Sequence, residues 1–184
     1  MRNLSELLNE IIPPSDYQHR NGFSNDHIID SLSENEILEV EDELIKSLKK
    51  SDDHLIGDTL AYMKSIKSLP ILNEKLNSSK APVSKINWAS FIFRIDSKNE
   101  EMKDIAFKEF QKVSGQYKLI SLFHILYCFN DSRINDRIKS YQNDKDYLIA
   151  YNARTTFGID TKDLIERERL KNKNKNPWWK FWKK

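Results

Sequence analysis

The chain has 184 residues, and its 30 Lys and Arg residues against 28 Asp and Glu residues leave a formal net charge of +2. A hydrophobic content of 39% is enough for a buried core, whereas four Gly and five Pro are too few for the many turns of an all-β fold. A single Cys excludes an internal disulfide framework, and neither a signal-peptide pattern nor a run of about 18 apolar residues occurs. We therefore expect a helical protein of the cytoplasm.

The N-terminal part of the chain predicts two short helices joined by a connector. Residues 1–12 mix apolar and polar side chains as an amphipathic helix does, and Pro13-Pro14 ends it because proline lacks the backbone N–H donor. Residues 13–25 contain many turn-forming residues and predict the connector. Residues 26–32 predict the second short helix.

The clearest helix pair follows. Ser33 and Glu36 have the spacing of an S-x-x-E capping box, which predicts a helix start at Ser33. The apolar residues that we place on one face of this helix are Ile37, Leu38, Val40, Leu44, Ile45 and Leu48. Ser51-Asp52-Asp53 ends this helix and caps the next one, in which His54 is expected to be exposed. A third helix opens at Pro70.

The second half of the chain predicts six further helices. Pro82 occupies the first position of one, Ser97 and Glu100 repeat the capping box at the next, and Gly115 is expected to terminate it as a C-cap. Residues 117–129 are apolar nearly all round, which predicts the most buried helix, with His124 as a hydrogen-bonded core residue and Cys128 as a buried small hydrophobe. Residues 130–132 and 144–146 cap two more helices. A charged helix starts at residue 162.

The helices repeat as pairs. The central positions of the second helix in each pair are Ala61, Ala89, Phe123 and Ala153, which are separated by 28, 34 and 30 residues. Each of the later pairs ends with an acidic residue directly before the next first helix. A repeat of helix pairs at this length is typical of an α-solenoid, in which each pair buries its apolar stripe against its neighbours.

On these features the chain resembles the HEAT-repeat family. The segments "IGDTLAYMKSIKSLPILNEKL" and "YLIAYNARTTFGID" resemble HEAT second helices, with a small residue in the middle. The resemblance implies an all-α fold, a short right-handed α-α superhelix with repeats over about residues 32–160. We expect a single domain over residues 1–170 and a basic tail over residues 171–184. An irregular helical bundle is the alternative.

No pattern of catalytic or ligand-binding residues occurs in the sequence. The four histidines form no H-x-x-x-H or H-E-x-x-H pair, and one cysteine cannot build a zinc cluster. The four glycines are too scattered to cradle phosphates. We therefore predict a non-enzymatic protein with no catalytic, cofactor-binding or metal-binding residues and no cofactor.

A cluster of acidic side chains is the first candidate binding feature. We predict a docking face for a basic protein partner, and the alternative is a solvated outer helix surface. The residues of this face are Glu34, Glu36, Glu39, Glu41, Asp42, Glu43, Asp52 and Asp53. By general type, small helical-repeat proteins of this kind resemble bacterial immunity proteins, which bind and neutralise a toxin domain. The resemblance implies a toxin-like basic partner.

The C-terminal tail is the second candidate feature. Its predicted contact residues are Trp178, Trp179, Lys180, Phe181, Trp182, Lys183 and Lys184. Tryptophan favours the membrane–water interface and lysine favours anionic lipid, so a peripheral membrane adaptor is the alternative function. The tail could instead fold back on the body or remain disordered. A HEAT-like DNA-binding protein or glycosylase is a third hypothesis, but residues before 171 carry a net charge of −4, so we expect no nucleic-acid partner.

Overall fold

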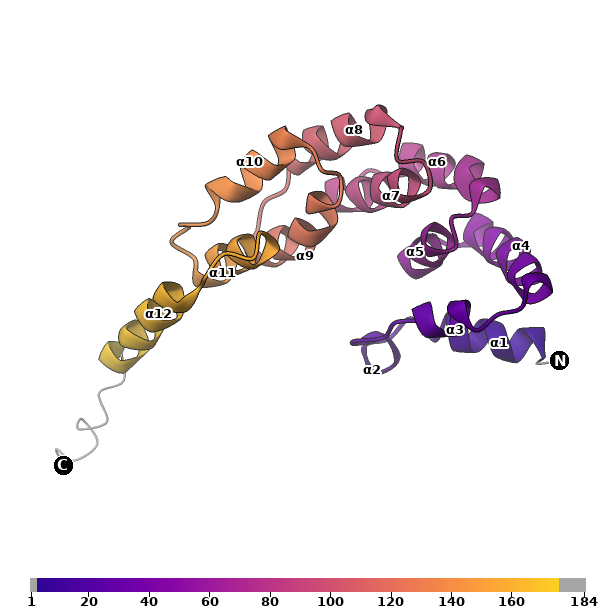
Figure 1. Cartoon of the computed structure of the whole chain (residues 1–184), viewed down its shortest axis with the longest axis horizontal. Helices are drawn as coiled ribbons and strands as arrows, with labels where there is room; N and C mark the ends of the chain where they lie inside the picture. The colour runs from indigo at the N-terminus through magenta and orange to yellow at the C-terminus, as the bar shows by residue number, and fades with distance from the viewer. Residues whose placement is uncertain (1–2, 176–184) are drawn as a thin grey trace, which may run out of the picture. The chain divides into compact units, whose positions relative to one another are not determined.

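The structure, a computed structural model, describes residues 3–175 (Figure 1). This part of the chain contains twelve α-helices, one 3₁₀ helix and no strand, which confirms the all-α prediction. The chain divides into two compact units, unit 1 (Met1–Glu109) and unit 2 (Phe110–Lys184), and each is described by itself. The prediction of one repeat domain over residues 1–170 stays a prediction. The predicted tail contacts at residues 178–184 lie outside the described residues.

Unit 1 begins with three short helices, and six further helices follow. Its helices are α1 (Leu4–Ile11), α2 (Tyr17–Arg20), α3 (Asp26–Asp30), α4 (Glu34–Lys50), α5 (His54–Tyr62), η1 (Ile66–Ser68), α6 (Leu69–Ser78), α7 (Pro82–Ile95) and α8 (Glu100–Phe110), whose last residue belongs to unit 2. The predicted capping box of Ser33 and Glu36 is present at α4, and Pro82 is the first residue of α7. Asp53 caps α5 by accepting a 3.0 Å hydrogen bond from the Leu55 N–H. Local sequence therefore determines these helix starts.

The core of unit 1 lies between α4, α5, α6 and α7, which pack against one another (Figure 1). Large side chains fill it, and Leu48, Leu60, Trp88 and Ile92 have at most 1% of their surface exposed. Gly57 permits the closest approach, because a Cβ atom there would lie 2.6 Å from Trp88 Cζ3. The close packing of α5 on α7 therefore depends on the missing side chain of Gly57.

A buried amide fixes the N-terminal helices onto this core. Asn25 is 3% exposed, and its Nδ2 donates to the Ile11 carbonyl at 2.9 Å and to the Thr59 hydroxyl oxygen at 2.8 Å. Thr59 in turn donates to the Leu55 carbonyl at 2.7 Å. Since a buried polar group is costly unless it is hydrogen-bonded, this network specifies how the ends of α1 and α3 meet α5.

Unit 2 is organised around two parallel helices. Its helices are α9 (Gln116–Tyr127), α10 (Ser132–Ser140), α11 (Tyr147–Thr156) and α12 (Lys162–Lys175). Gln116 at the start of α9 donates to Asp146, the N-cap of α11, at 2.8 Å. At the other end, the rings of Tyr127 and Phe157 meet at 5.1 Å. Helices α9 and α11 therefore lie side by side with an offset of 30 residues, which equals the spacing of Phe123 and Ala153 in the sequence.

Two helix boundaries differ from the predictions. Helix α8 starts at Glu100, so Ser97 lies in the preceding turn and does not begin the helix. The Lys98 and Asn99 N–H groups bond to Asp96 instead, which makes Asp96 the residue that shapes this turn. Gly115 is the N-cap of α9, with φ of 95°, and not the C-cap of α8. The short α8 ends at Phe110, and a connector separates it from the glycine.

The prediction that residues 117–129 form the most buried helix was wrong in part. Leu119, Leu122, Phe123 and Leu126 are buried, but Tyr117 is 74% exposed and Tyr127 is 44% exposed. His124 and Cys128 also lie on the exposed side, contrary to prediction. The partner helices α10 and α11 cover only one side of α9, so the apolar side chains on its other side stay exposed to solvent.

Candidate functional site

The predicted acidic face lies mainly on α4 in unit 1. Glu34, Glu39 and Asp42 are exposed on this helix, and the structure adds an exposed apolar residue, Leu38, at 52%. Glu34, Leu38 and Asp42 follow one another at intervals of four residues, so they form one row along the helix. We call these four residues the α4 surface. The α4 surface therefore exposes three carboxylates and one apolar side chain to solvent.

Leu38 was placed on the buried face of α4 by the sequence analysis, and the structure corrects this. The buried residues of α4 are Val40, Glu41, Leu44 and Leu48, with spacings of one, three and four residues. At 100° per residue, Leu38 points roughly 105° away from the middle of that stripe. The helical angle was therefore a signal in the sequence that could have identified Leu38 as exposed.

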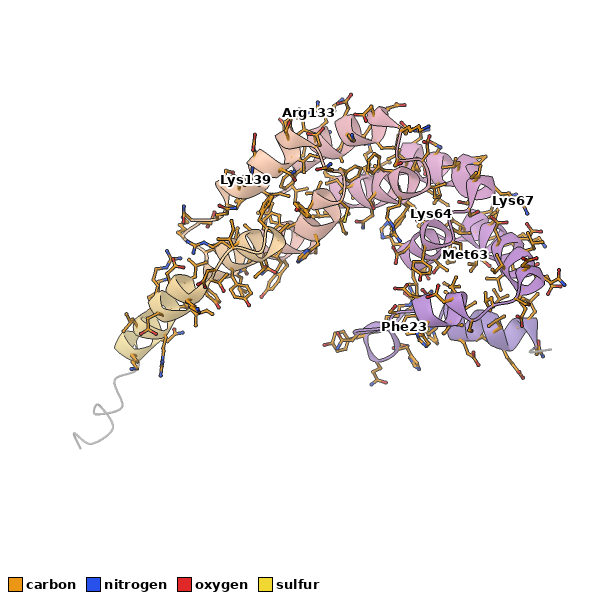
Figure 2. The ribbon with its side chains drawn as sticks, viewed as in Figure 1. Phe23, Met63, Lys64, Lys67, Arg133 and Lys139 are labelled. Carbon is orange, nitrogen blue, oxygen red and sulfur yellow. The ribbon has the colours of Figure 1, made fainter. Side chains whose placement is uncertain are left out.

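Glu41 is the predicted acid that the structure removes from the surface. It is buried at 9% exposure, and its carboxylate lies 3.1 Å from the Nζ of Lys67 in η1, which is labelled in Figure 2. The same Nζ lies 3.5 Å from Asp42. The hydrogen bond with Glu41 raises the pKa of Lys67, so the amine stays charged at neutral pH. Glu41 therefore stabilises the contact between α4 and η1, and Asp42 keeps an exposed side chain beside it.

The remaining predicted acids also have intramolecular partners. Glu36 completes the capping box by accepting from the Ser33 N–H at 2.9 Å. Glu43 lies 2.6 Å from Lys46 on the same helix, and Asp52 lies 2.8 Å from Lys75. Glu36 and Glu43 are only partly exposed and Asp52 lies beyond the end of α4, so we do not include them in the α4 surface.

Asp53 is held by a cation from a distant part of the chain. Two Arg20 nitrogens donate to its two carboxylate oxygens at 2.7 Å, and Arg20 also donates to the Pro13 carbonyl at 2.8 Å. The Arg20 hydrogen bonds lower the pKa of Asp53 below its usual value of 3.8. The Asp53 carboxylate accepts from Arg20 on both oxygens and also from the Leu55 N–H at the start of α5, so it is a structural group.

A hollow of about 570 Å³ opens beside this ion pair. Its lining residues are Ser15, Arg20, Ser51, Asp52, Asp53, His54 and Leu55. His54 was predicted to be exposed but is half-buried, with its ring 4.7 Å from the ring of Trp88. Burial lowers the pKa of His54 below its usual value of 6.5, so its imidazole is neutral at pH 7. The ionised groups of the hollow are compensated by Arg20 and Lys75, which leaves no uncompensated charge to attract a ligand.

The two units differ in net charge by more than the acidic body and the basic tail that the sequence analysis distinguished. Unit 1 contains 14 Lys and Arg residues against 20 Asp and Glu residues, a net charge of −6. Unit 2 contains 16 against 8, a net charge of +8. Opposite net charges of this size attract different partners. The α4 surface belongs to the acidic unit.

The structure also bears on metal binding and membrane spanning within residues 3–175. In this range no group of three or more His, Cys, Asp or Glu side chains is placed to hold a metal ion. None of the helices in the same range has the length and apolar content needed to cross a bilayer.

Comparisons with protein-family models, with curated proteins and with solved structures yield no match for this chain.

Proposed function

We propose that this chain is a non-catalytic, HEAT-like protein-binding scaffold of the cytoplasm, which binds and neutralises a basic protein partner through the α4 surface, as an immunity protein does. The observation that carries the proposal is the exposed Leu38 within a row of carboxylates on the acidic unit. The partner chemistry that this surface fits is a basic protein with an apolar recess.

An apolar side chain among charges has the composition of a protein interface. Burying a fully exposed Leu side chain contributes about 1.5–3 kcal/mol, and Leu38 already exposes about half of its surface. The carboxylates of Glu34, Glu39 and Asp42 would contribute mostly to the association rate and to the choice of partner. Leu38 therefore supplies binding energy, and the acids supply specificity for a basic surface.

The packing of the helices within each unit supports the HEAT-like part of the proposal. The second helices of successive pairs lie against each other, α5 on α7 in unit 1 and α9 on α11 in unit 2. The small residues Ala61, Ala89 and Ala153 of these helices are fully buried. Pairs that bury their stripes against neighbouring pairs are what an α-solenoid requires.

Affinity capture with matched variants tests the binding site. The immobilised wild-type chain is expected to retain a basic protein from an extract of the source cells, and the triple variant Glu34→Lys, Glu39→Lys, Asp42→Lys is expected to lose it. A second triple variant, Glu6→Lys, Glu10→Lys, Glu101→Lys, changes the net charge equally at exposed acids outside the α4 surface and is expected to retain it.

The retained protein then tests the remaining parts of the proposal. We expect its association rate constant to fall about tenfold or more between low and physiological salt, since steering by complementary charge is screened. Leu38→Ser should weaken the complex about tenfold by accelerating dissociation. The partner expressed alone should inhibit growth, and co-expression of the wild-type chain should restore it. Retention of the same protein by the α4 triple variant would refute the binding site.

A further inference from the structure

We propose that unit 2 binds single-stranded nucleic acid through a surface of α9 and the start of α11, with bases stacked on its tyrosines and phosphates held by neighbouring lysines. This goes beyond the proposed function, because it assigns a second surface on the other unit and a second kind of partner. We call it the tyrosine surface, and its residues are Tyr117, Lys118, Tyr127, Lys145, Tyr147 and Tyr151.

The side of α9 that its partner helices leave uncovered carries aromatic rings. Tyr117 is 74% exposed and Tyr127 is 44% exposed. At 100° per residue, Tyr117 points roughly 170° away from the middle of the stripe that α9 buries, so its ring points into solvent. The two tyrosines are separated by ten positions, which corresponds to about 15 Å along the helix. This is the length of a short single-stranded segment.

Helix α11 continues this aromatic surface. It packs beside α9, and the ring of Phe157 at its end lies 5.1 Å from the ring of Tyr127 (Figure 1). At its start the rings of Tyr147 and Tyr151, both partly exposed, meet at 5.7 Å. Every base has a flat face that stacks on such rings, which makes exposed aromatic side chains a platform for single strands of any sequence.

The two helices of this surface contain no acidic residue. Neither α9 nor α11 has an Asp or a Glu, and residues 110–130 have none either. Asp146 precedes α11 as its N-cap, and its carboxylate accepts hydrogen bonds from Gln116 and from the N–H groups of Leu148 and Ile149. The acid next to the tyrosine surface is therefore engaged by the protein itself, and a polyanion meets no carboxylate on either helix.

Lysines beside the tyrosines are available to phosphate groups. Lys118 and Lys145 are exposed, and neither takes part in an ion pair within residues 3–175. Lys145 also lines a hollow of about 380 Å³ together with Tyr147 and Lys171, which is large enough for one nucleotide unit. Glu168 in the wall of this hollow lies 3.3 Å from Lys171, which leaves the charge of Lys145 uncompensated.

The net charge of unit 2 removes the reason for which the sequence analysis expected no nucleic-acid partner. That expectation rested on the charge of residues 1–170 together, which combines an acidic unit with most of a basic one. Residues 110–175 alone contain 13 Lys and Arg residues against 8 Asp and Glu residues, a net charge of +5. An acidic protein would be attracted by the same charge, but it has no bases to stack on the tyrosines. The aromatic rings therefore favour the nucleic acid.

The experiment is fluorescence anisotropy of a fluorescein-labelled oligothymidylate titrated with the full chain. We expect binding at low salt that weakens as salt is raised, because phosphate contacts release counterions. Unlabelled oligothymidylate, its duplex with oligoadenylate, and polyglutamate serve as competitors. The unlabelled single strand should displace the probe at a concentration of negative charge about tenfold lower than either of the others, since neither of them presents unpaired bases.

Matched variants separate stacking from charge. Tyr117→Ala combined with Tyr127→Ala should weaken binding about thirtyfold or more, and Tyr117→Phe combined with Tyr127→Phe should bind like the wild type, because phenylalanine keeps the stacking ring. Lys118→Gln should lower the slope of log affinity against log salt by about 0.7, the change expected when one phosphate contact with a single strand is lost. The controls are Tyr17→Ala and Lys49→Gln, which replace an exposed tyrosine and an exposed lysine of unit 1 and should leave binding unchanged.

Three results would overturn the proposal. They are no binding of oligothymidylate at low salt, displacement by polyglutamate or by the duplex as readily as by the single strand, and wild-type affinity in the double alanine variant. Circular dichroism checks that each variant keeps the wild-type helix content, and Tyr117→Ala alone, at a mostly exposed side chain, carries the test if the double variant does not. Leu38→Ser should bind the oligonucleotide like the wild type, so a failure of this proposal is distinguishable from a failure of the α4 surface.

Discussion

Replacing Gly57 by Ala tests the packing of α5 against α7, on which unit 1 depends. An added Cβ would lie 2.6 Å from Trp88 Cζ3 and 2.8 Å and 2.9 Å from two ring atoms of Phe91. Both rings are buried, at 1% and 6% exposure, so neither can rotate away freely. The substitution must push the two helices apart or force a ring from its rotamer.

Two opposing effects decide whether Gly57→Ala raises or lowers the free energy of unfolding. Alanine favours a helix interior over glycine by about 1 kcal/mol, whereas overpacking a well-filled core costs about 1–3 kcal/mol. Three contacts below 3.0 Å with two rigid rings place Gly57→Ala at the upper end of that range. We therefore expect a net loss of about 2 kcal/mol in the free energy of unfolding, which lowers the midpoint temperature by about 4–8 °C.

Thermal and urea unfolding, followed by circular dichroism, measure this change. Ser47→Ala on the exposed side of α4 is the control for helix propensity and should be neutral or slightly stabilising. In the background Trp88→Phe, which removes one of the clashing ring atoms, Gly57→Ala should cost measurably less. If Gly57→Ala alone unfolds at or above the wild-type temperature, the close approach of α5 and α7 described here is wrong.

Three further substitutions probe the ion pair, the buried amide and the exposed leucine. The pKa of Asp53 is lowered in the folded chain, so its pairing with Arg20 stabilises the fold above about pH 4, and this stabilisation is lost as the pH falls below that value. Asp53→Asn should therefore lower the free energy of unfolding by about 1–2 kcal/mol at pH 7. Urea unfolding from pH 7 to pH 3 should show that the free energy of unfolding of this variant falls less steeply with acid than that of the wild type. Asn25→Ala should cost about 2 kcal/mol, because it leaves the Ile11 carbonyl and the Thr59 hydroxyl without their donor, and a loss below about 0.5 kcal/mol in urea unfolding would contradict the buried network. Leu38→Ser should change the free energy of unfolding, measured by urea unfolding, by no more than about 0.5 kcal/mol, since about half of the side chain is exposed to solvent; a larger loss would show that Leu38 belongs to the core.

The candidate site was only partly predictable from the sequence. The positions of the acids on α4 followed from the capping box and helical spacing, and the structure places Glu34 and Glu39 in solvent as expected. The pairing of Glu41 with Lys67 was not predictable, because the two residues are 26 positions apart and meet only when η1 packs on α4. The same holds for Asp53 and Arg20, which are 33 positions apart.

The all-α class and the starts of most helices follow from local sequence, because a helix cap is made with backbone N–H groups two or three residues away. Ser33, Asp53 and Pro82 show this directly. Which side of each helix is covered depends instead on how the helices pack against one another. Cys128 lies in an apolar segment and yet in solvent, because α10 and α11 cover the opposite side of α9, and a helix cannot encode in its own composition where its neighbours will lie.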